Sequence, residues 1–495
     1  MTEWEPVIGV EIHVQLSTRT KMFCGCELSF GDPPNVHTCP VCLGLPGALP
    51  VLNARAVRHG ILIGLALESE IAERSLFHRK NYFYPDLPKG YQISQYDVPL
   101  CRGGHLEDVR IHRVHLEEDA AKLVHLGESG RIHGSDRSIV DFNRGGTPLV
   151  EIVTEPDFGS AERTRQWLTL LRTTLKQLGV SDAKMEEGSL RCDANVSVRP
   201  IGSTTLGTKT ELKNMNSFRF VERGIDAEIA RQIALLEAGG EVQQETLHFD
   251  PATGRLTSLR SKEEAHDYRY FPEPDLVPLA VDEEMLAAAR AELPELPAAR
   301  AARFEHELGL SAERARELAF RAELADYFER ALAANGATSA DVESPSADSI
   351  RSAGPDPVAV ANWIPQLVER IGSEADPAQS KVAPGALAAL VAMVAAKEVG
   401  REAARDVLTR LVAEGGDPRA IVQAEGLGAL GAEDGGVAEL VDRAIAADPE
   451  AADRVRTGNA KAIGPLVGYV MRESKGRADG AEVGRLIRER LLNQQ

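Results

Sequence analysis

The chain has 495 residues, which is too long for a single compact core and predicts two to four domains. Its apolar fraction of 43% and charged fraction of 26% are those of a globular protein, and they exclude a fibrous or largely disordered chain. The formal charge of −19 argues against indiscriminate nucleic-acid binding, so any RNA contact must be confined to a local basic patch.

Two features predict where the protein works. The longest uncharged apolar run, residues 386–396, is far too short to cross a bilayer. The first six residues carry acids where a secretory signal would carry Lys or Arg. We therefore expect a cytoplasmic protein with no membrane partner.

Residues 1–292 mix short strand-like runs with Gly, Pro and Asn turns and hold nearly all the motifs, so they are predicted to form a mixed-sheet catalytic domain. Within the first strand, residues 8–16, apolar residues occupy the even positions and polar residues or Gly the odd ones. A helix is predicted between Ser160, which can cap it, and Gly179, which can end it. Because the remainder is helical in period, the fold class is α+β.

The later part of the chain is predicted to be all-helical, with one domain at 293–405 and a small tail domain at 406–495. A long helical segment is expected between Ser311 and Gly336, and a loop or short disordered insertion at 339–357. Basic residues outnumber acidic ones in the last 45 residues, which makes the tail the best candidate for an RNA-binding patch. A solvated helical face of mixed charge explains the same composition.

The first strand places Glu11, His13 and Gln15 on one face, with neighbours about 6.5 to 7 Å apart along the backbone, so that their side chains can converge on one ion. Three consecutive carboxylates at 117–119 repel one another unless a cation or solvent screens them. A polar sheet face that meets water and an exposed acidic cluster explain these features equally, so a metal site depends on their combination with Glu151.

Residues 79–95 combine cations, aromatic rings and amides, which suit a nucleotide or the end of an RNA. The alternative is that the aromatic rings pack in a core and the lysines are solvated. No phosphate-binding loop supports the first interpretation, because the nearest candidate, residues 202–210, has one residue too many between its second glycine and Lys209. That segment is predicted to be a turn between strands.

Four cysteines form two close pairs, Cys24 with Cys26 and Cys39 with Cys42, separated by twelve residues. This is the spacing of a zinc knuckle, and a reducing cytosol favours metal over disulfides. A site filled by four thiolates has no open position, so a structural Zn²⁺ is predicted. The other two cysteines, Cys101 and Cys192, are expected to be reduced thiols.

Four long segments together resemble one enzyme family. They are DFNRGGTPLVE at 141–151, KMEEGSLRCDAN at 184–195, ELKNMNSF at 211–218 and HDYRYFPEPD at 266–275. Over essentially its whole length the chain resembles the B subunit of the aspartyl/glutamyl-tRNA amidotransferases, including a helical tail that grips tRNA.

The resemblance implies that Glu11, His13, Glu117 and Glu151 hold a divalent ion that also meets the phosphates of ATP. Mg²⁺ is the implied ion, although it prefers oxygen ligands and Mn²⁺ would tolerate the histidine better. Lys80 is implied to contact phosphate, and Lys89 to form an ammonia gate beside Glu118. The other residues implied at the nucleotide pocket are Asn81, Tyr82, Tyr84, Gln92 and Ser94.

The implied reaction uses ATP to phosphorylate the side-chain carboxylate of Glu-tRNA(Gln) or Asp-tRNA(Asn), after which ammonia displaces phosphate. The sequence contains no Gly/Ser-rich amidase motif with a Ser-Ser-Lys constellation, so the glutaminase A subunit must supply ammonia, while the small C subunit stabilises the complex. Which of the two tRNAs is used stays open. Two rival interpretations are a zinc-stabilised RNA-binding adaptor without ATP chemistry and a standalone ligase that takes free ammonia.

Overall fold

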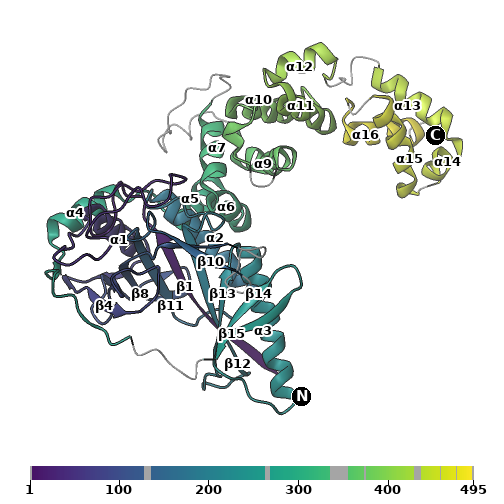
Figure 1. Ribbon diagram of the computed structural model, residues 1–495. Helices are drawn as coiled ribbons and strands as arrows, with labels where there is room; N and C mark the ends of the chain where they lie inside the picture. Colours follow the sequence, from purple (N-terminus) through teal and green to yellow (C-terminus); the bar gives the residue numbers. More distant parts are fainter. Residues whose placement is uncertain are drawn as a thin grey trace. The chain divides into compact units, whose positions relative to one another are not determined.

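The computed structural model describes residues 3–126, 135–261, 268–334, 355–372, 375–428, 436–457, 459–474 and 477–492. The chain divides into two compact units, Met1–Leu296 and Pro297–Gln495 (Figure 1). Among the helices in these ranges, none is both long and apolar enough to span a membrane.

The first unit is built on a ten-stranded sheet in the order β15-β14-β13-β12-β1-β11-β8-β6-β2, with β7 paired to β8. Its neighbouring strands are antiparallel except β13 and β14, which are parallel, so the sheet is mixed and the α+β prediction is confirmed. The strands are β1 (Trp4–Gln15), β2 (Glu70–Ile71), β6 (Cys101–Arg102), β7 (His105–Leu106), β8 (Val109–Glu118), β11 (Pro148–Thr154), β12 (Leu190–Pro200), β13 (Thr210–Met215), β14 (Glu245–Asp250) and β15 (Arg255–Ser261).

Strand β1 lies in the middle of this sheet and alternates as predicted. Its apolar residues from Ile8 to Val14 are at most 1% exposed, whereas His13 and Gln15 keep partial exposure on the other face. The register pairs His13 with Glu151 of β11, and Glu151 with His115 of β8. Side chains paired in this way lie about 4.5 to 5.5 Å apart at Cβ, so three strands bring their polar residues together on one face.

Three helices pack around the sheet: α1 (Ala54–Ala66), α2 (Ala161–Gln177) and α3 (Phe218–Glu237). A fourth, α4 (Glu283–Glu292), packs on α1. Helix α1 packs so closely on β8 that a Cβ at Gly60 would lie 3.2 Å from Leu116 Cδ2. Leu116 faces this helix, so the residues before and after it, His115 and Glu117, project from the opposite face of the sheet. In α2, Ser160 accepts a hydrogen bond from the Arg163 amide, which confirms the predicted cap.

Three small sheets complete the first unit: β16-β4-β5, β10-β9 and β17-β3. The three-stranded one brings the segment after residue 268 beside residues 78–94, and β5 packs against β8. The predicted turn at 202–210 connects β12 to β13. The bounds are β3 (Arg74–Ser75), β4 (His78–Asn81), β5 (Tyr91–Ser94), β9 (Lys122–Leu126), β10 (Arg137–Asp141), β16 (Phe271–Pro272) and β17 (Leu279–Ala280).

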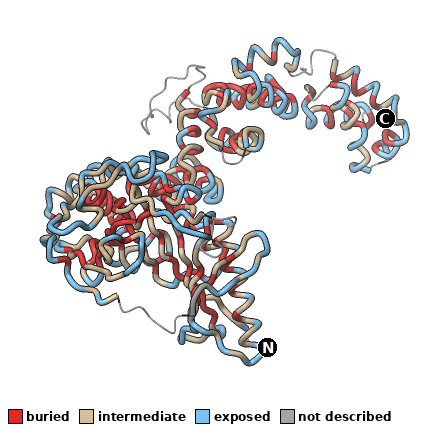
Figure 2. Tube along the Cα trace, in the orientation of Figure 1, coloured by how far each residue is buried: buried red, intermediate tan, exposed pale blue. Residues whose placement is uncertain are grey.

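The second unit is helical throughout its described residues and holds two separate buried cores (Figure 2). The first core runs from Ala301 to Val422 and the second from Val437 to Leu491. The helices are α5 (Pro297–Leu308), α6 (Ala312–Ala319), α7 (Ala322–Ala333), α9 (Pro357–Ile371), η1 (Pro377–Gln379), α10 (Pro384–Ala395), α11 (Arg401–Glu414), α12 (Pro418–Glu425), α13 (Gly436–Ala447), α14 (Pro449–Arg456), η3 (Ala460–Ala462), α15 (Ile463–Glu473) and α16 (Gly480–Leu492).

The long helical segment expected between Ser311 and Gly336 is two helices, α6 and α7, which part at Phe320 and Arg321. No glycine or proline marks this break in the sequence. The insertion expected at 339–357 lies almost wholly outside the described residues.

Candidate metal site

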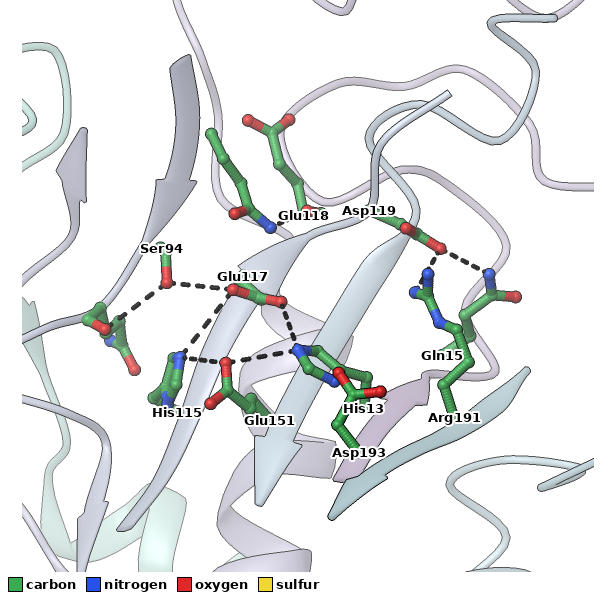
Figure 3. Close-up of polar contacts among 12 residues, drawn as sticks. His13, Gln15, Ser94, His115, Glu117, Glu118, Asp119, Glu151, Arg191 and Asp193 are labelled. Carbon is green, nitrogen blue, oxygen red and sulfur yellow. Dashed lines mark hydrogen bonds and ion pairs between the residues drawn. The ribbon is translucent and has the colours of Figure 1, made fainter. Parts of the chain in front are cut away.

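Three polar side chains, from His13, Glu117 and Glu151, meet on one face of the sheet (Figure 3). His13 Nε2 lies 3.7 Å from Glu117 Oε1 and 3.4 Å from Glu151 Oε2. One ligand atom from each of the three residues lies within 4.8 Å of the others, and the two carboxylates are buried. This donor set fits one divalent cation, and its imidazole nitrogen suits Mn²⁺ better than Mg²⁺.

Glu11 is not part of this cluster of ligand atoms. Its carboxylate, two residues before His13 on the same face of β1, accepts a hydrogen bond of 3.0 Å from the Asn195 amide of β12. The structure therefore brings together three of the four residues expected at the metal, and Glu11 lies beside them.

The positive charge on His13 and the negative charges on the carboxylates stabilise one another. Burial opposes a charge on His13, but a hydrogen bond to Glu151 and the charges of Glu117 and Glu151 outweigh it and raise the pKa of His13 to about 9. Burial likewise opposes the Glu151 carboxylate, yet His115 and His13 hold the pKa of Glu151 well below its usual value. Without a cation, the cluster therefore holds a proton on His13, which a metal must displace.

His115 is a buried member of the site that we did not expect from the sequence. Its Nε2 lies 3.3 Å from Glu151 Oε2 and 3.9 Å from Glu117 Oε2, and its Nδ1 accepts a hydrogen bond of 3.4 Å from the Arg113 guanidinium. Because a guanidinium can only donate, Nε2 carries the ring proton and points it at the carboxylates. The signal in the sequence was its position, two residues before Glu117 on a strand.

Lys80 lies near this cluster on β4. Burial opposes its charge, but the carboxylates of Glu117 and Glu151 outweigh this and raise the pKa of Lys80. Its ammonium lies 4.9 Å from the centre of the Tyr268 ring. The lysine therefore stays charged beside the acids, where it can meet a phosphate.

The amides and hydroxyl expected to bind the nucleotide are engaged within the protein. Asn81 donates to the carbonyls of Tyr268 and Arg269, Gln92 donates to the carbonyl of Glu118, and Ser94 donates to Glu117 at 3.1 Å. These three residues can hold the site in shape.

Aromatic rings line this region more extensively than expected. Tyr82 and Tyr84 stack with centres 5.7 Å apart, and Tyr96 stacks on Tyr270 at 4.3 Å. Tyr268 contacts both Tyr82 and Tyr270. Tyr268 and Tyr270 belong to the segment 266–275, which carries part of the family resemblance but has no local signal that places these rings at the site.

Lys89 and Glu118, which the resemblance places at an ammonia gate, form a close ion pair. Glu118 is 3% exposed and also accepts a hydrogen bond of 3.0 Å from the Ile93 amide. The adjacent Asp119 has partners of its own, the Gln15 amide at 2.7 Å and Arg191 at 2.9 Å. The three consecutive carboxylates therefore have different partners: Glu117 belongs to the metal cluster, Glu118 pairs with Lys89, and Asp119 pairs with Gln15 and Arg191.

The motif at 141–151 runs from the last residue of β10 into β11 and lies against the end of β8, where the Gly146 amide donates to the Asp119 carbonyl at 2.8 Å. Arg144 donates to the carbonyls of Ala120 and Ala121, and Gly146 has a φ of +87°, which favours glycine. The buried Lys21 donates to the Phe142 carbonyl. This turn therefore fixes the start of the strand that carries Glu151.

Cys24, Cys26, Cys39 and Cys42 lie in the segment between β1 and α1, and their four sulfur atoms lie within 4.8 Å of one another. Hydrogen bonding from Cys24 outweighs burial and, with the Cys39 amide and the charge of Lys21, lowers the pKa of Cys42 to about 4. The cluster can therefore bind a metal, and four thiols in this arrangement fit a structural zinc ion.

Comparison with known proteins agrees with this geometry. Residues 6–287 match the family model of the GatB/GatE catalytic domain, and residues 347–491 match that of the GatB domain. Proteins named as the B subunit of aspartyl/glutamyl-tRNA(Asn/Gln) amidotransferase are similar along the whole chain. The protein from Anaeromyxobacter sp. (strain Fw109-5) is 47% identical over 502 residues, covering 99% of each chain. Those from Geobacter sulfurreducens and Frankia casuarinae are each 48% identical, covering 99% of this chain and 99% and 96% of their own. The chain therefore belongs to the family of aspartyl/glutamyl-tRNA(Asn/Gln) amidotransferase B subunits.

Proposed function

We propose that this chain activates and amidates the side-chain carboxylate of a glutamate or aspartate carried by a mischarged tRNA. Its family is that of the B subunit of a tRNA-dependent amidotransferase, a carbon–nitrogen ligase with glutamine as amido donor. A carboxylate oxygen attacks the γ-phosphorus of ATP and ADP departs. Ammonia then attacks the carbonyl carbon of the acyl phosphate, and phosphate leaves with that oxygen. The products are Gln-tRNA(Gln) or Asn-tRNA(Asn).

The observation that carries the proposal is the meeting of His13, Glu117 and Glu151 on one sheet face. A divalent cation held there, Mg²⁺ or Mn²⁺, would neutralise charge on the transferring phosphoryl group. His115 points Nε2 at the carboxylates of Glu117 and Glu151 and orients them. Lys80 lies beside the same acids and is suited to bind a phosphate oxygen.

The stacked rings near Lys80 are suited to hold a base of ATP or of the tRNA end, because any base can stack on an aromatic face. Glu11 lies beside the three clustered residues, where it can contact the cation through a water molecule.

Ammonia must come from elsewhere, since the sequence has no amidase motif. We propose that a glutaminase A subunit supplies it, that a small C subunit stabilises the assembly, and that Lys89 with Glu118 receives the ammonia. Because the substrate is a tRNA, we place the assembly in the cytoplasm.

The tail helices α13 to α16 are proposed to contact tRNA. Several of their arginines already pair with carboxylates, among them Arg454 with Glu450 and Arg485 with Glu482. The affinity therefore depends on arginines exchanging these partners for phosphate, and it should be strongly salt-dependent.

An isotope experiment tests the chemistry. The assembled complex is given tRNA charged with glutamate in which both side-chain carboxylate oxygens are ¹⁸O, together with ATP and ammonium. We expect one ¹⁸O atom in the phosphate for each amide formed. Phosphate without label would mean that ATP is hydrolysed by water, and tRNA binding without ATP consumption would identify an adaptor instead.

A further inference from the structure

A small cavity of about 80 Å³ lies between the four-cysteine segment and the Lys89–Glu118 ion pair. Its lining includes Cys42, Gly44 and Leu45 from the four-cysteine segment, and Lys89, Tyr91 and Glu118 from the ion pair and β5. A cavity needs about 10 to 15 Å³ to hold one water molecule, so several molecules the size of water or ammonia fit here. A nucleotide does not fit, since ligand pockets of that kind are about 300 Å³ or more.

Gly44 is where these two groups of lining residues touch. It has a φ of +67°, and a Cβ at this position would lie 2.5 Å from Lys89 Cγ and 3.0 Å from Lys89 Cα. The backbone at Gly44 therefore rests directly on the lysine that pairs with Glu118. A side chain here would push Lys89 away from its partner.

The turn that carries Gly44 is built on the cysteines. The Leu43 amide donates to the Cys39 carbonyl at 3.1 Å, the Gly44 amide to Val41 at 3.0 Å, and the Leu45 amide to Pro40 at 2.9 Å. Two of the four cysteines, Cys39 and Cys42, lie inside this turn. A metal that binds all four would hold the turn, and with it Gly44, in place.

We propose that ammonia passes through this small cavity on its way to the activated carboxyl group. In this proposal the four-cysteine metal site forms one wall of the cavity and holds Lys89 against Glu118. This inference rests on the proposed function. In this role the metal keeps ammonia from escaping to water before it reaches the activated carboxyl group, so its loss uncouples glutamine hydrolysis from amidation.

The chain offers a matched pair of variants. Gly44→Ala places a methyl group against Lys89, whereas Gly47→Ala adds the same group in the same loop, at a φ of +85° and with no atom within 4 Å. Both variants carry backbone strain, but only the first disturbs the cavity. The third sample is Cys39→Ser/Cys42→Ser, whose zinc content is measured to confirm that the metal is lost.

Each sample is studied as the assembled complex. Glutamate released per amidated tRNA is measured with glutamine as donor, and the amidation rate is measured separately with ammonium. For Gly44→Ala and the cysteine variant we expect the released glutamate to rise from about one to at least about three per amide, with a smaller change in the ammonium-supported rate. Gly47→Ala should match the unsubstituted chain.

Hydrogen exchange supplies a readout independent of catalysis. The Ile93 amide donates to Glu118, so displacing Lys89 should speed exchange in residues 86–95 of Gly44→Ala and of the cysteine variant. The inference would be overturned if Gly44→Ala and the cysteine variant both released about one glutamate per amide and both showed unchanged hydrogen exchange in residues 86–95. If the unsubstituted complex forms no amide from either donor, the proposed function itself fails.

Discussion

His13 and Glu151 face each other across β1 and β11, with 3.4 Å between Nε2 and Oε2. This contact is a long hydrogen bond, and Glu117 Oε1 lies 3.7 Å from the same nitrogen. The pair is therefore placed to share a cation lying between the strands.

Glu151→Gln should remove most of the metal affinity while the sheet stays intact, because the amide keeps the shape and loses the charge. Loss of an outer partner typically costs 10- to 100-fold in metal affinity, so loss of a ligand should cost more than about 100-fold. Mn²⁺ binding measured by electron paramagnetic resonance checks this. Affinity for tRNA should stay within about twofold, and normal Mn²⁺ binding by the variant would remove Glu151 from the site.

Metal affinity should also depend on pH through His13. A cation needs the neutral ring, and with a pKa of about 9 the ring is protonated at neutral pH in the metal-free protein. Affinity should therefore rise about tenfold per unit from about pH 6.5 to about pH 8 and fall on acidification. Titration with Mn²⁺ at several pH values measures the slope. His13→Asn, which has no such proton, should bind more weakly with a flat profile, and an equal slope in both would contradict the assignment.

His115 should act as a positioning residue for the two carboxylates. Gln places an amide nitrogen near the position of Nε2, so His115→Gln should keep much of the Mn²⁺ affinity. His115→Phe fills the same buried space without a donor and should lose about 10- to 100-fold. Equal Mn²⁺ affinity in the two variants, at equal thermal stability, would show that the proton on Nε2 does not matter.

Much of this site could be predicted from local patterns. Alternation along β1 was enough to place Glu11 and His13 on one face, and cysteine spacing was enough to find four thiols. Which acids meet depends on the register between β1, β8 and β11, which are far apart in sequence. That register turns Glu11 towards Asn195, for which the sequence has no local signal, and it brings His115 to Glu151, which its position two residues before Glu117 does not specify.

The helical unit shows the same limit. The helical period continues from Ser311 to Gly336, yet the chain breaks between α6 and α7 at Arg321, whose side chain makes no capping hydrogen bond. Tertiary packing explains the break: Leu318 and Ala319 before it and Leu324 after it are all buried in the same core. Local propensity cannot report such a packing requirement.

Truncation after Gly428 should separate RNA binding from stability. The first helical core ends at Val422 and the second begins at Val437, so this cut leaves the first core whole. We expect melting of the remaining chain to change little, while tRNA affinity falls and its dependence on salt flattens by about 0.9 in slope for each phosphate that the protein no longer binds. Filter binding over a range of salt concentrations measures the tRNA affinity and its dependence on salt. A cut at residue 410 is the contrasting control, because it removes Leu411 and Val422 from the first core and should lower the melting temperature. An unchanged salt slope after the cut at Gly428 would exclude helices α13 to α16 from RNA contact.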